Sequence, residues 1–559
     1  MRLKNGVAFA GLTLLAFLFA GCQLFQDETE PTPPGQQPTS PAEVPAVPPE
    51  VAAAAHEWPM GNRDYSNTRA TMDAQIDSTN VHELGMAWTM PLTAASDWGT
   101  AASTPLIANG IVYFQDLMTN VSALDLETGN IIWQQNYNRA ALGPNGPAIG
   151  WGKVFIQDGI NNFIALDIDN GEELWSTQLE PSTGTQQPYV YGGYVYTGTG
   201  AGKPVEGPEH SGGRQSYVGG TSGIVYGLDQ ETGGIIWNFQ VVEEGFWGDP
   251  DTNGGGALWY PPGIDTDTGL TFWGTGNPAP FPGTVEQPNA SSRPGPNLYS
   301  NTMLAIDGST GELVWHNQVK SHDLFDLDFQ GSPVLATALI DGQERDVVMG
   351  WGKLGIVYAF DRQTGEIVWQ TPVGEHQNDE LQEIPPGEEI LVIPGVWGGV
   401  ETPVALADSV LYVLTNNLGS PYTATGFDSE NAAEAVTSSE GRTNLQDGEG
   451  VFVAIDINTG DILWERHFET PAFGGATVVN DLVFTATLGG TIHALSREDG
   501  STVWSMQAPG GIIAWPAVAE DTIVWPAGLG REPTLFALRL GAEGDIVPPA
   551  AQAEPTEAP

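Results

Sequence analysis

Three carboxylates crowd one short apolar stretch of the chain, "SHDLFDLDFQG". Asp323, Asp326 and Asp328 stand there between leucine and phenylalanine residues. Like charges this close repel one another, and each costs free energy when it is buried without a partner. Positions two apart on a strand share a face, so Asp326 and Asp328 can point at one cation. From these residues alone, the stretch is either a solvated acidic turn or half of a cation site.

The elements that must position these side chains come from a dodecamer that recurs seven times. Its copies begin at Ala123, Ala165, Gly227, Ala305, Ala359, Ala454 and Ala494. In every copy a Gly precedes a Trp by four residues, and in six copies an Asp precedes that Trp by eight. The apolar residues before the Asp predict the end of one strand. The following turn uses Gly for its positive φ, and the apolar run ending in Trp predicts the next strand.

Repeats 40 to 95 residues apart predict stacked supersecondary units. With four short strands in each unit, closure into a ring predicts an all-β, eight-bladed β-propeller. Each Trp is expected to wedge between neighbouring blades. Residues 82–90 and 532–540 offer two further strands, and we expect these two segments to pair and complete the eighth blade. An open solenoid is the alternative architecture.

The charge balance is extreme, with 69 Asp and Glu against 18 Lys and Arg and a formal net charge of −51. Such a field repels nucleic acid and anionic lipid head groups, and it favours cations or basic protein partners. We therefore expect no nucleic-acid partner. A solvated surface suited to salt or to an exposed location would explain the same charge.

The N-terminus has the features of an export signal. Arg2 and Lys4 precede an apolar run that is shorter than a membrane-spanning helix needs. The run ends at "LFAGC", which resembles a bacterial lipobox with Phe19 in place of the usual Leu. Cys22 is then the expected lipidation site, and it would hold the protein at the outer face of the cell membrane or in the periplasm. An ordinary signal peptide with a chance Cys is the alternative.

Cys22 is the only Cys, so we expect no internal disulfide, no thiolate metal site and no C-x-x-C-H haem attachment. A composition rich in Pro, Glu and Ala predicts disorder in the segment that follows the signal and in the C-terminal tail. The expected domains are a lipoprotein signal peptide at 1–21, a linker at 22–57, the propeller at 58–545 and a tail at 546–559.

The dodecamer resembles the tryptophan-docking motif of the quinoprotein alcohol dehydrogenases, eight-bladed propellers that bind pyrroloquinoline quinone (PQQ). The same repeat occurs in structural propellers, including an outer-membrane assembly lipoprotein. Three segments are more specific and are similar to signature segments of the dehydrogenases: "FWGTGNPAPF" at 272–281, "SHDLFDLD" at 321–328 and "GWGKLGIVYAFDR" at 350–362. The resemblance runs from about residue 58 to residue 540.

The resemblance implies roles for four residues. Asn277 matches a metal-binding Asn, and Asp326 matches the catalytic base, which also faces the metal. Asp328 stands where lanthanide-dependent methanol dehydrogenases and glucose-type quinoproteins both carry an Asp, so Ca²⁺ and a lanthanide remain open. Lys353 matches a basic residue that contacts the quinone. Carboxylate and amide oxygens are hard ligands suited to either ion.

Three features of the family are changed in this sequence. The family's metal-binding Glu lies in a region that is longer and different here, 197–229, in which Glu206 and Glu209 are candidates. Asp251 replaces the Trp that stacks under the quinone, and Trp247 is the nearby candidate for a cofactor contact. The vicinal Cys pair is absent, because the chain has no second Cys.

These features together predict an exported quinoprotein that oxidises an alcohol or a sugar-like hydroxyl with PQQ and a metal. Without a haem motif, the electrons must pass to a separate carrier, and the acidic surface suits a basic c-type cytochrome or a cupredoxin. Two alternatives stay open. One is a non-catalytic binding or scaffold propeller that has lost PQQ, and the other is a lectin-like propeller that binds sugars or polymers through exposed Trp residues.

Overall fold

The computed structural model describes residues 44–179, 186–200, 203–204, 215–216, 221–425, 443–530 and 532–549. Cys22, Glu206 and Glu209 lie outside these ranges, so their roles stay predictions. Within the described ranges, no helix is both long enough and apolar enough to cross a membrane. Regular structure there is almost entirely β-sheet, as the repeats predict.

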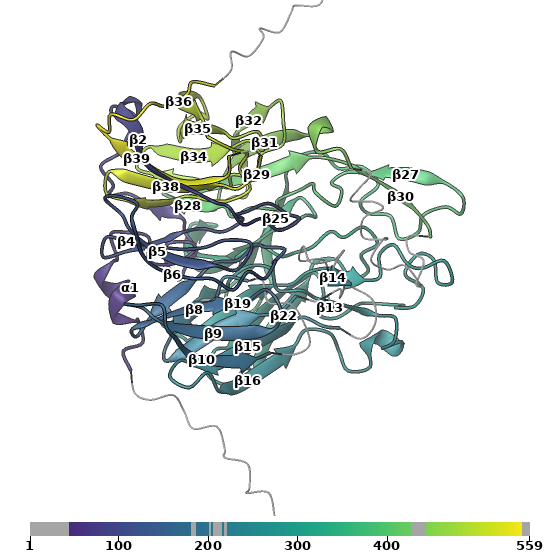
Figure 1. Cartoon of the computed structure of the whole chain (residues 1–559). Helices are drawn as coiled ribbons and strands as arrows, with labels where there is room; N and C mark the ends of the chain where they lie inside the picture. The colour runs from purple at the N-terminus through teal and green to yellow at the C-terminus, as the bar shows by residue number, and fades with distance from the viewer. Residues whose placement is uncertain are drawn as a thin grey trace, which may run out of the picture. The chain divides into compact units, whose positions relative to one another are not determined.

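Small antiparallel sheets are arranged as the blades of a ring, and each blade runs from an inner strand to an outer strand (Figure 1). The strands of blades 1 to 4 are, in order, β3 (Leu106–Ala108), β4 (Ile111–Gln115), β5 (Val121–Asp125) and β6 (Ile131–Gln135); β7 (Ala148–Gly150), β8 (Lys153–Gln157), β9 (Asn162–Asp167) and β10 (Glu173–Gln178); β11 (Tyr189–Tyr191), β12 (Tyr194–Gly198), β15 (Ile224–Asp229) and β16 (Ile235–Gln240); β18 (Gly263–Ile264), β19 (Leu270–Gly274), β21 (Thr302–Asp307) and β22 (Leu313–Gln318).

Blades 5 to 8 repeat this arrangement, and the last blade takes its outer strand from the other end of the chain. Their strands are β23 (Val334–Ile340), β24 (Gln343–Gly350), β25 (Ile356–Asp361) and β26 (Ile367–Pro372); β28 (Ala405–Ala407), β29 (Val410–Asn417), β31 (Glu449–Asp456) and β32 (Ile462–Phe468); β33 (Thr477–Val479), β34 (Leu482–Ala486), β35 (Thr491–Ser496) and β36 (Thr502–Gln507); β37 (Ala517–Ala519), β38 (Thr522–Ala527), β39 (Thr534–Leu540) and β2 (Leu84–Pro91).

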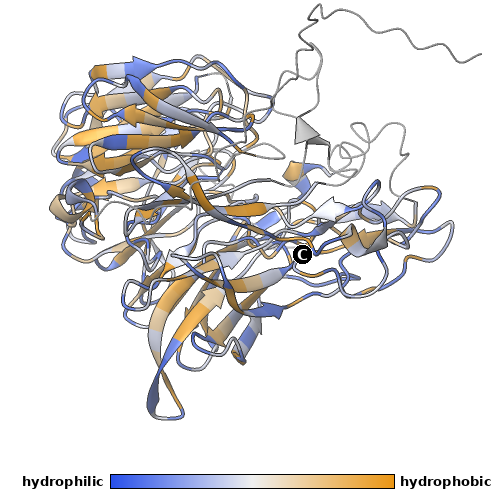
Figure 2. Ribbon diagram, turned by 90° about the horizontal axis from the view of Figure 1, so that it is seen from below, coloured by the Kyte–Doolittle hydropathy of each residue, from blue (hydrophilic) through white to orange (hydrophobic). Residues whose placement is uncertain are grey.

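The ring closes because β2 pairs antiparallel with β39, with Trp88 opposite Ala537. The two strands lie side by side in Figure 1, although they come from opposite ends of the fold. The predicted eight-bladed propeller and the predicted pairing of the two terminal segments are both confirmed. Orange strands within the blades in Figure 2 mark the apolar cores between neighbouring sheets.

The repeated Trp and Gly form one contact at seven of the eight junctions between neighbouring blades. The indole N–H of Trp315 in blade 4 donates to the carbonyl of Arg362 in blade 5 at 3.1 Å. The ring lies against Gly365, where φ is 72°. A Cβ added at Gly365 would stand 2.4 Å from Cε3 of Trp315. The turn Gly is therefore required twice, for its positive φ and for the flat surface on which the preceding blade's Trp docks.

The segment before β2 runs along the inner strands of successive blades and pairs with several of them. The carbonyls of Tyr65, Ser66, Thr68 and Arg69 accept backbone N–H groups from blades 4, 5, 6 and 7, at 2.8 to 3.0 Å. The next two residues form β1 (Ala70–Thr71), which pairs parallel with β33. The fully buried guanidinium of Arg69 donates to acceptors that include Thr104, Thr477 and the carbonyl of Pro516. This one segment therefore makes hydrogen bonds to blades in both halves of the ring.

The predicted linker boundary at 57 is wrong for its last part. Residues 44–57 include the helix α1 (Pro49–Ala53) and lie against the first blades. The Glu50 carboxylate accepts the N–H groups of Trp151 and Gly152 at 2.9 and 2.7 Å, and the carbonyl of Ala46 accepts that of Gly192 at 2.8 Å. The composition did not predict this ordered part. A Pro-rich segment can still be ordered when a neighbouring turn offers backbone N–H groups that need an acceptor.

Antiparallel pairing puts two kinds of connection on one face of the ring, which we call the upper face. They are the link from each outer strand to the inner strand of the next blade, and the loop between the second and third strands of a blade. Additional short elements lie in these connections: β17 (Gly254–Gly255) with β20 (Pro278–Ala279), β13 (Lys203–Pro204) with β14 (Gln215–Ser216), β27 (Glu389–Val392) with β30 (Ser420–Thr423), and the 3-10 turns η3 (Phe246–Gly248) and η5 (Leu445–Asp447). A further turn, η1 (Val81–Glu83), leads directly into β2.

The docking contact makes a prediction that separates steric clash from backbone strain. Gly365→Ala should lower the free energy of unfolding by about 2–4 kcal/mol, because the new methyl group meets Trp315 and φ is positive. Gly342→Ala is the matched control in the same blade, since its φ is 77° and nothing lies within 4 Å of the added Cβ. It should cost only about 1 kcal/mol. Equal losses in urea unfolding would contradict the docking role.

Candidate functional site

Five side chains from three successive blade connections and one loop gather near the axis on the upper face, and we call them the axial cluster. Tyr260 precedes the inner strand of blade 4, and Asp326 and Asp328 lie in the connection from blade 4 to blade 5. Lys353 lies in the loop between β24 and β25, and Glu401 precedes the inner strand of blade 6. Residues far apart in the sequence meet here because the ring brings its connections to a common centre.

Lys353 binds both predicted carboxylates at once. Its Nζ lies 2.8 Å from Oδ2 of Asp326 and 2.9 Å from Oδ2 of Asp328. The two aspartates are 6% and 1% exposed, so the solvated-turn interpretation is wrong. Burial acts to lower the pKa of Lys353. The negative charges of Asp326, Asp328 and Glu401 outweigh that effect, so its pKa stands well above the usual value.

Asp323, the first of the three crowded carboxylates, has a different role. Its Oδ1 accepts the N–H of Phe325 at 2.9 Å, and its Oδ2 accepts the N–H of Leu327 at 2.6 Å. It is fully buried and shapes the loop that carries Asp326. Three like charges can therefore lie within six residues because one turns back to its own backbone and two share a lysine.

Asn277 lies beside Asp328, but through its backbone. Its N–H donates to Oδ1 of Asp328 at 2.6 Å, while its side-chain Nδ2 donates to the carbonyl of Pro278 at 3.2 Å. The backbone is close at this point, since a Cβ at Gly276 would stand 2.7 Å from the same carboxylate oxygen. The sequence motif around Asn277 thus does meet the Asp326 motif in space.

The predicted metal ligands that can be seen are oxygen donors placed around one positive charge. The Lys353 ammonium demonstrates that Asp326 and Asp328 can share a cation. Within the described ranges, no three carboxylate, His or Cys side chains converge in the way a metal ion needs. The two aspartates with Asn277 make up the described part of the predicted set, and Glu206 falls outside those ranges.

Two members of the axial cluster were missed by the sequence analysis. The charge of Glu401 acts on Lys353, and its carbonyl accepts the hydroxyl of Tyr260. Burial raises the pKa of Tyr260 well above its usual value, and the charge of Glu401 raises it further. The cluster thus brings three carboxylates to one Lys. A recurring Pro just before the inner strands, as in "YPPGI" and "ETPVA", was the signal that could have found both residues.

Trp247 and Asp251 occupy the connection that also carries Tyr260. Trp247 lies in η3, is half-buried, and donates its indole N–H to the carbonyl of Leu298 at 3.0 Å. Its partner is thus a backbone carbonyl of a neighbouring loop rather than a member of the axial cluster. Asp251, at the position of the family's stacking Trp, is exposed. A cofactor contact by Trp247 stays a prediction.

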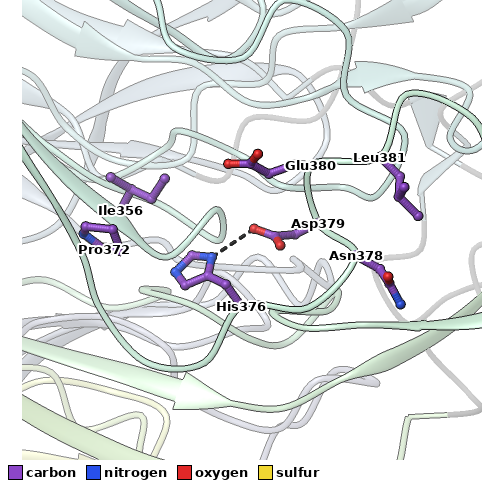
Figure 3. Close-up of a pocket in the computed structure, with 7 residues that line it drawn as sticks. All are labelled: Ile356, Pro372, His376, Asn378, Asp379, Glu380 and Leu381. Atoms are coloured by element: carbon purple, nitrogen blue, oxygen red, sulfur yellow. Dashed lines mark hydrogen bonds and ion pairs between the residues drawn. The ribbon is translucent and has the colours of Figure 1, made fainter.

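A pocket of about 500 Å³ opens beside the Lys353 loop (Figure 3). Ile356, Pro372 and Leu381 form its apolar lining, and His376 and Asp379 form an ion pair at 2.8 Å across it. The other ring nitrogen of His376 lies 3.2 Å from the carbonyl of Gly355, which ends the Lys353 loop. The hydrogen bond with Asp379 raises the pKa of His376, against the opposing effect of burial. The pocket wall therefore fastens this loop by a titratable contact.

The ring of docked Trp residues and the charged centre define the protein as an eight-bladed β-propeller with a buried ion cluster of Asp326, Asp328 and Lys353. Residues 209–390 match the family model described as the glucose/ethanol/alcohol dehydrogenase β-propeller domain. Residues 85–206, 353–473 and 447–538 match the model of the outer membrane protein assembly factor BamB. The chain is therefore similar to the PQQ-dependent alcohol dehydrogenases over its middle part and to the BamB propellers over most of the remaining blades.

Relatives with curated names match over most of their length. The quinohemoprotein alcohol dehydrogenase ADH IIB of Pseudomonas putida is 28% identical over 531 residues, which cover 84% of this chain and 72% of the relative. The lanthanide-dependent methanol dehydrogenase of Methylorubrum extorquens is 26% identical over 513 residues, covering 80% and 82%. The structure of a europium-containing methanol dehydrogenase superposes with a TM-score of 0.72 at 22% identity, covering 88% of this chain and 100% of the other, and supports the fold.

The His376 contact predicts a pH dependence with a definite sign. Because the pKa of His376 is raised above its ordinary 6.5, the ion pair stabilises the fold fully below about pH 6 and ceases to do so as the pH rises through the raised pKa. The difference in unfolding midpoint between the wild type and His376→Gln should therefore be largest below pH 6.5 and shrink as the pH rises through the raised pKa of His376. His82→Gln, at an exposed site, is the control. A difference that grows with pH would contradict the assignment.

Proposed function

We propose that this chain is an exported quinoprotein that oxidises an alcohol or a sugar-like hydroxyl with PQQ and a bound Ca²⁺ or lanthanide ion. The observation that carries the proposal is that Asp326 and Asp328 lie 2.8 and 2.9 Å from the same Lys353 ammonium. The chemistry named for the relatives, quinohemoprotein alcohol dehydrogenase and lanthanide-dependent methanol dehydrogenase, supports it.

The chain's own residues have distinct tasks in this proposal. When bound, PQQ supplies a hydride acceptor, and the hard cation supplies a Lewis acid at its carbonyl. Asp326, at the more accessible end of the pair, takes the proton of the substrate hydroxyl at its carboxylate. Asp328 and Asp326 would hold the cation together with Asn277 and, we propose, Glu206. Lys353 sets a fixed positive charge beside the acceptor, where negative charge develops during reduction.

The substrate and the electron acceptor are proposed only as chemical classes. The substrate is a small alcohol or polyol, because a single carboxylate base acts on a hydroxyl proton in this scheme. The electrons leave to an external carrier such as a c-type cytochrome or a cupredoxin. A basic carrier is favoured by the net charge of −51, and its attraction should weaken as salt screens the charges.

A non-catalytic scaffold or binding propeller is the second candidate function. Asp251 favours it, because an exposed carboxylate stands where an enzyme of this family has the Trp that stacks under its quinone. The side-chain amide of Asn277, directed to the carbonyl of Pro278, also favours it. The shared Lys353 favours the enzyme, because two buried carboxylates are costly to keep in a protein that does not use them.

Export with a lipid anchor at Cys22 is proposed from the "LFAGC" motif. Cys22→Ala should move the protein from the detergent-soluble envelope fraction to the soluble fraction, because no lipid can be attached. The distribution is measured by cell fractionation and immunoblotting. An unchanged distribution between the two fractions would contradict the lipid anchor and favour export by an ordinary signal peptide.

The catalytic proposal makes a prediction that separates binding from turnover. The metal-free protein should bind PQQ only with Ca²⁺ or La³⁺ present, and Asp328→Ala should weaken binding more than tenfold, because the cation loses a ligand. Asp326→Asn should keep binding but lower kcat by about 10²–10⁴-fold, because the base is lost. Binding is followed by absorbance and Trp fluorescence, and turnover with a c-type cytochrome or a cupredoxin as acceptor.

Asp341→Asn is the control for this experiment, because it removes one carboxylate from an exposed turn of blade 5. Its binding and turnover should equal those of the wild type. No PQQ binding with any ion would favour the scaffold function. Full turnover in Asp326→Asn would remove Asp326 as the base.

A further inference from the structure

We infer that Tyr422, delivered by the small sheet of β27 and β30, positions Asp326 for the proposed reaction. The inference rests on the proposed function, because it gives Tyr422 a task only if Asp326 is the base. In this scheme Tyr422 acts on Asp326 through the backbone. Its hydroxyl donates to the carbonyl of Phe325, 2.8 Å away, and so fixes the peptide that enters Asp326.

Asp326 needs such support because its backbone is in the left-handed region, with φ of 60°. Residues other than Gly adopt this conformation reluctantly, and it persists when the surroundings determine it. The conformation has a clear purpose here. It turns the Asp326 carboxylate towards Lys353 while the neighbouring Phe325 and Leu327 point into an apolar core.

Most of the support for this loop comes from blade 4 and its own connections. Asp323 accepts the N–H groups of Phe325 and Leu327. Asn301 donates its Nδ2 to the carbonyl of Leu327 at 2.7 Å, and the N–H of Phe329 donates to Thr275 at 3.2 Å. These bonds hold the chain that follows Asp326, and they satisfy the N–H groups of its two neighbours, Phe325 and Leu327. They leave the carbonyl before Asp326 to another partner.

Tyr422 supplies that partner from blade 6. It lies on β30, opposite Ile390 on β27, and only 2% of it is exposed. Its ring meets that of Phe325 edge-on, with centroids 5.2 Å apart and planes at 61°. The pairing of β30 with β27 and the contact with the Phe325 ring therefore fix the direction of the Tyr422 hydroxyl. The small sheet carries the link outward from blade 6 to the loop of blade 4.

The sheet is itself fastened to the same loop region at a second point. Asn289, in the loop between β19 and β21, accepts the N–H of Ile384 at 2.9 Å and donates its own N–H to the carbonyl of Ala424 at 3.1 Å. Ile384 and Ala424 flank β27 and β30 in the sequence and share one apolar cluster with Phe325 and Tyr422. The connections of blades 4, 5 and 6 thus form a roof beside the axial cluster, in which Tyr422 provides the polar contact to the Asp326 loop.

Removing only the hydroxyl should affect the reaction more than the fold. In Tyr422→Phe the ring still packs against Phe325, but the fully buried Phe325 carbonyl loses its donor. The peptide between Phe325 and Asp326 is then free to rotate, and Asp326 can leave its left-handed backbone conformation. The carboxylate moves relative to Lys353 and to the substrate hydroxyl, and small displacements of a catalytic group lower rates steeply.

The test compares Tyr422→Phe with Tyr196→Phe. Tyr196 is also buried, and its hydroxyl also donates to a backbone carbonyl, that of Gly308 at 3.1 Å, but at the contact between blades 3 and 4. Hydrogen exchange of residues 321–329 is measured first, without cofactor. It should be about tenfold faster in Tyr422→Phe and unchanged in Tyr196→Phe. Unchanged exchange in Tyr422→Phe overturns the inference, whatever the activity is.

Kinetics of the PQQ- and cation-loaded proteins then test the link to Asp326. Tyr422→Phe should lower kcat about tenfold with KM changed less than twofold, and Tyr196→Phe should match the wild type. In the Asp326→Asn background, Tyr422→Phe should cause no further loss, because both act on the same group. The positioning role is overturned if Tyr422→Phe lowers kcat in the Asp326→Asn background by the same factor as in the wild type. It is also overturned if Tyr422→Phe alone has a normal kcat. A wild type that binds no PQQ refutes the proposed function and the catalytic part of the inference, while exchange alone decides whether Tyr422 holds the loop.

Discussion

The central interaction of the structure is one buried ion cluster, in which Asp326 and Asp328 share the ammonium of Lys353. Two carboxylates cannot be taken out of water this close together without a cation between them. Removing Lys353 would leave them uncompensated, at a cost of about 3–5 kcal/mol. The pair lies in one connection and the lysine in a loop of the next blade, so only a ring that holds these blades in register can form the cluster.

Two sets of contacts hold the blades in register, one between neighbouring blades and one across the ring. Between neighbours, each docked Trp rests on the turn Gly of the next blade, as Trp315 does on Gly365. Across the ring, the segment of residues 65–71 gives its carbonyls to successive inner strands, and the buried Arg69 ties its far side. Burial lowers the pKa of Arg69 to about 9, yet it stays charged at neutral pH and satisfied by its acceptors. The charges of this arginine and of Lys353 both act on Tyr260.

The sequence predicted the ring well because its determinants are local. The Gly-to-Trp spacing encodes one hairpin and one docking surface, and seven copies with two spare strands leave little choice but eight blades. The motifs around Asn277, Asp326 and Lys353 were also short enough to recognise. Glu401 and Tyr260 were missed, because each reaches the axis only through the position of its inner strand in the closed ring.

Other features depended on contacts that no local pattern contains. Three aspartates in six residues looked equivalent, but Asp323 turns to its own backbone while the other two face Lys353. The order of residues 44–57 depends on bare N–H groups at Trp151 and Gly152, a hundred residues away. Tyr422 carried no motif, and its place beside Phe325 follows from a small sheet built by two separate connections.

The most direct test of the central claim is anomalous X-ray diffraction from crystals of the protein loaded with PQQ and La³⁺. The account predicts one strong peak on the axis of the ring, about 2.3–2.7 Å from carboxylate oxygens of both Asp326 and Asp328, with quinone density beside Lys353. A peak elsewhere, or no ordered cation or quinone at the axis while Lys353 keeps both carboxylates, would contradict it and leave the propeller as a scaffold.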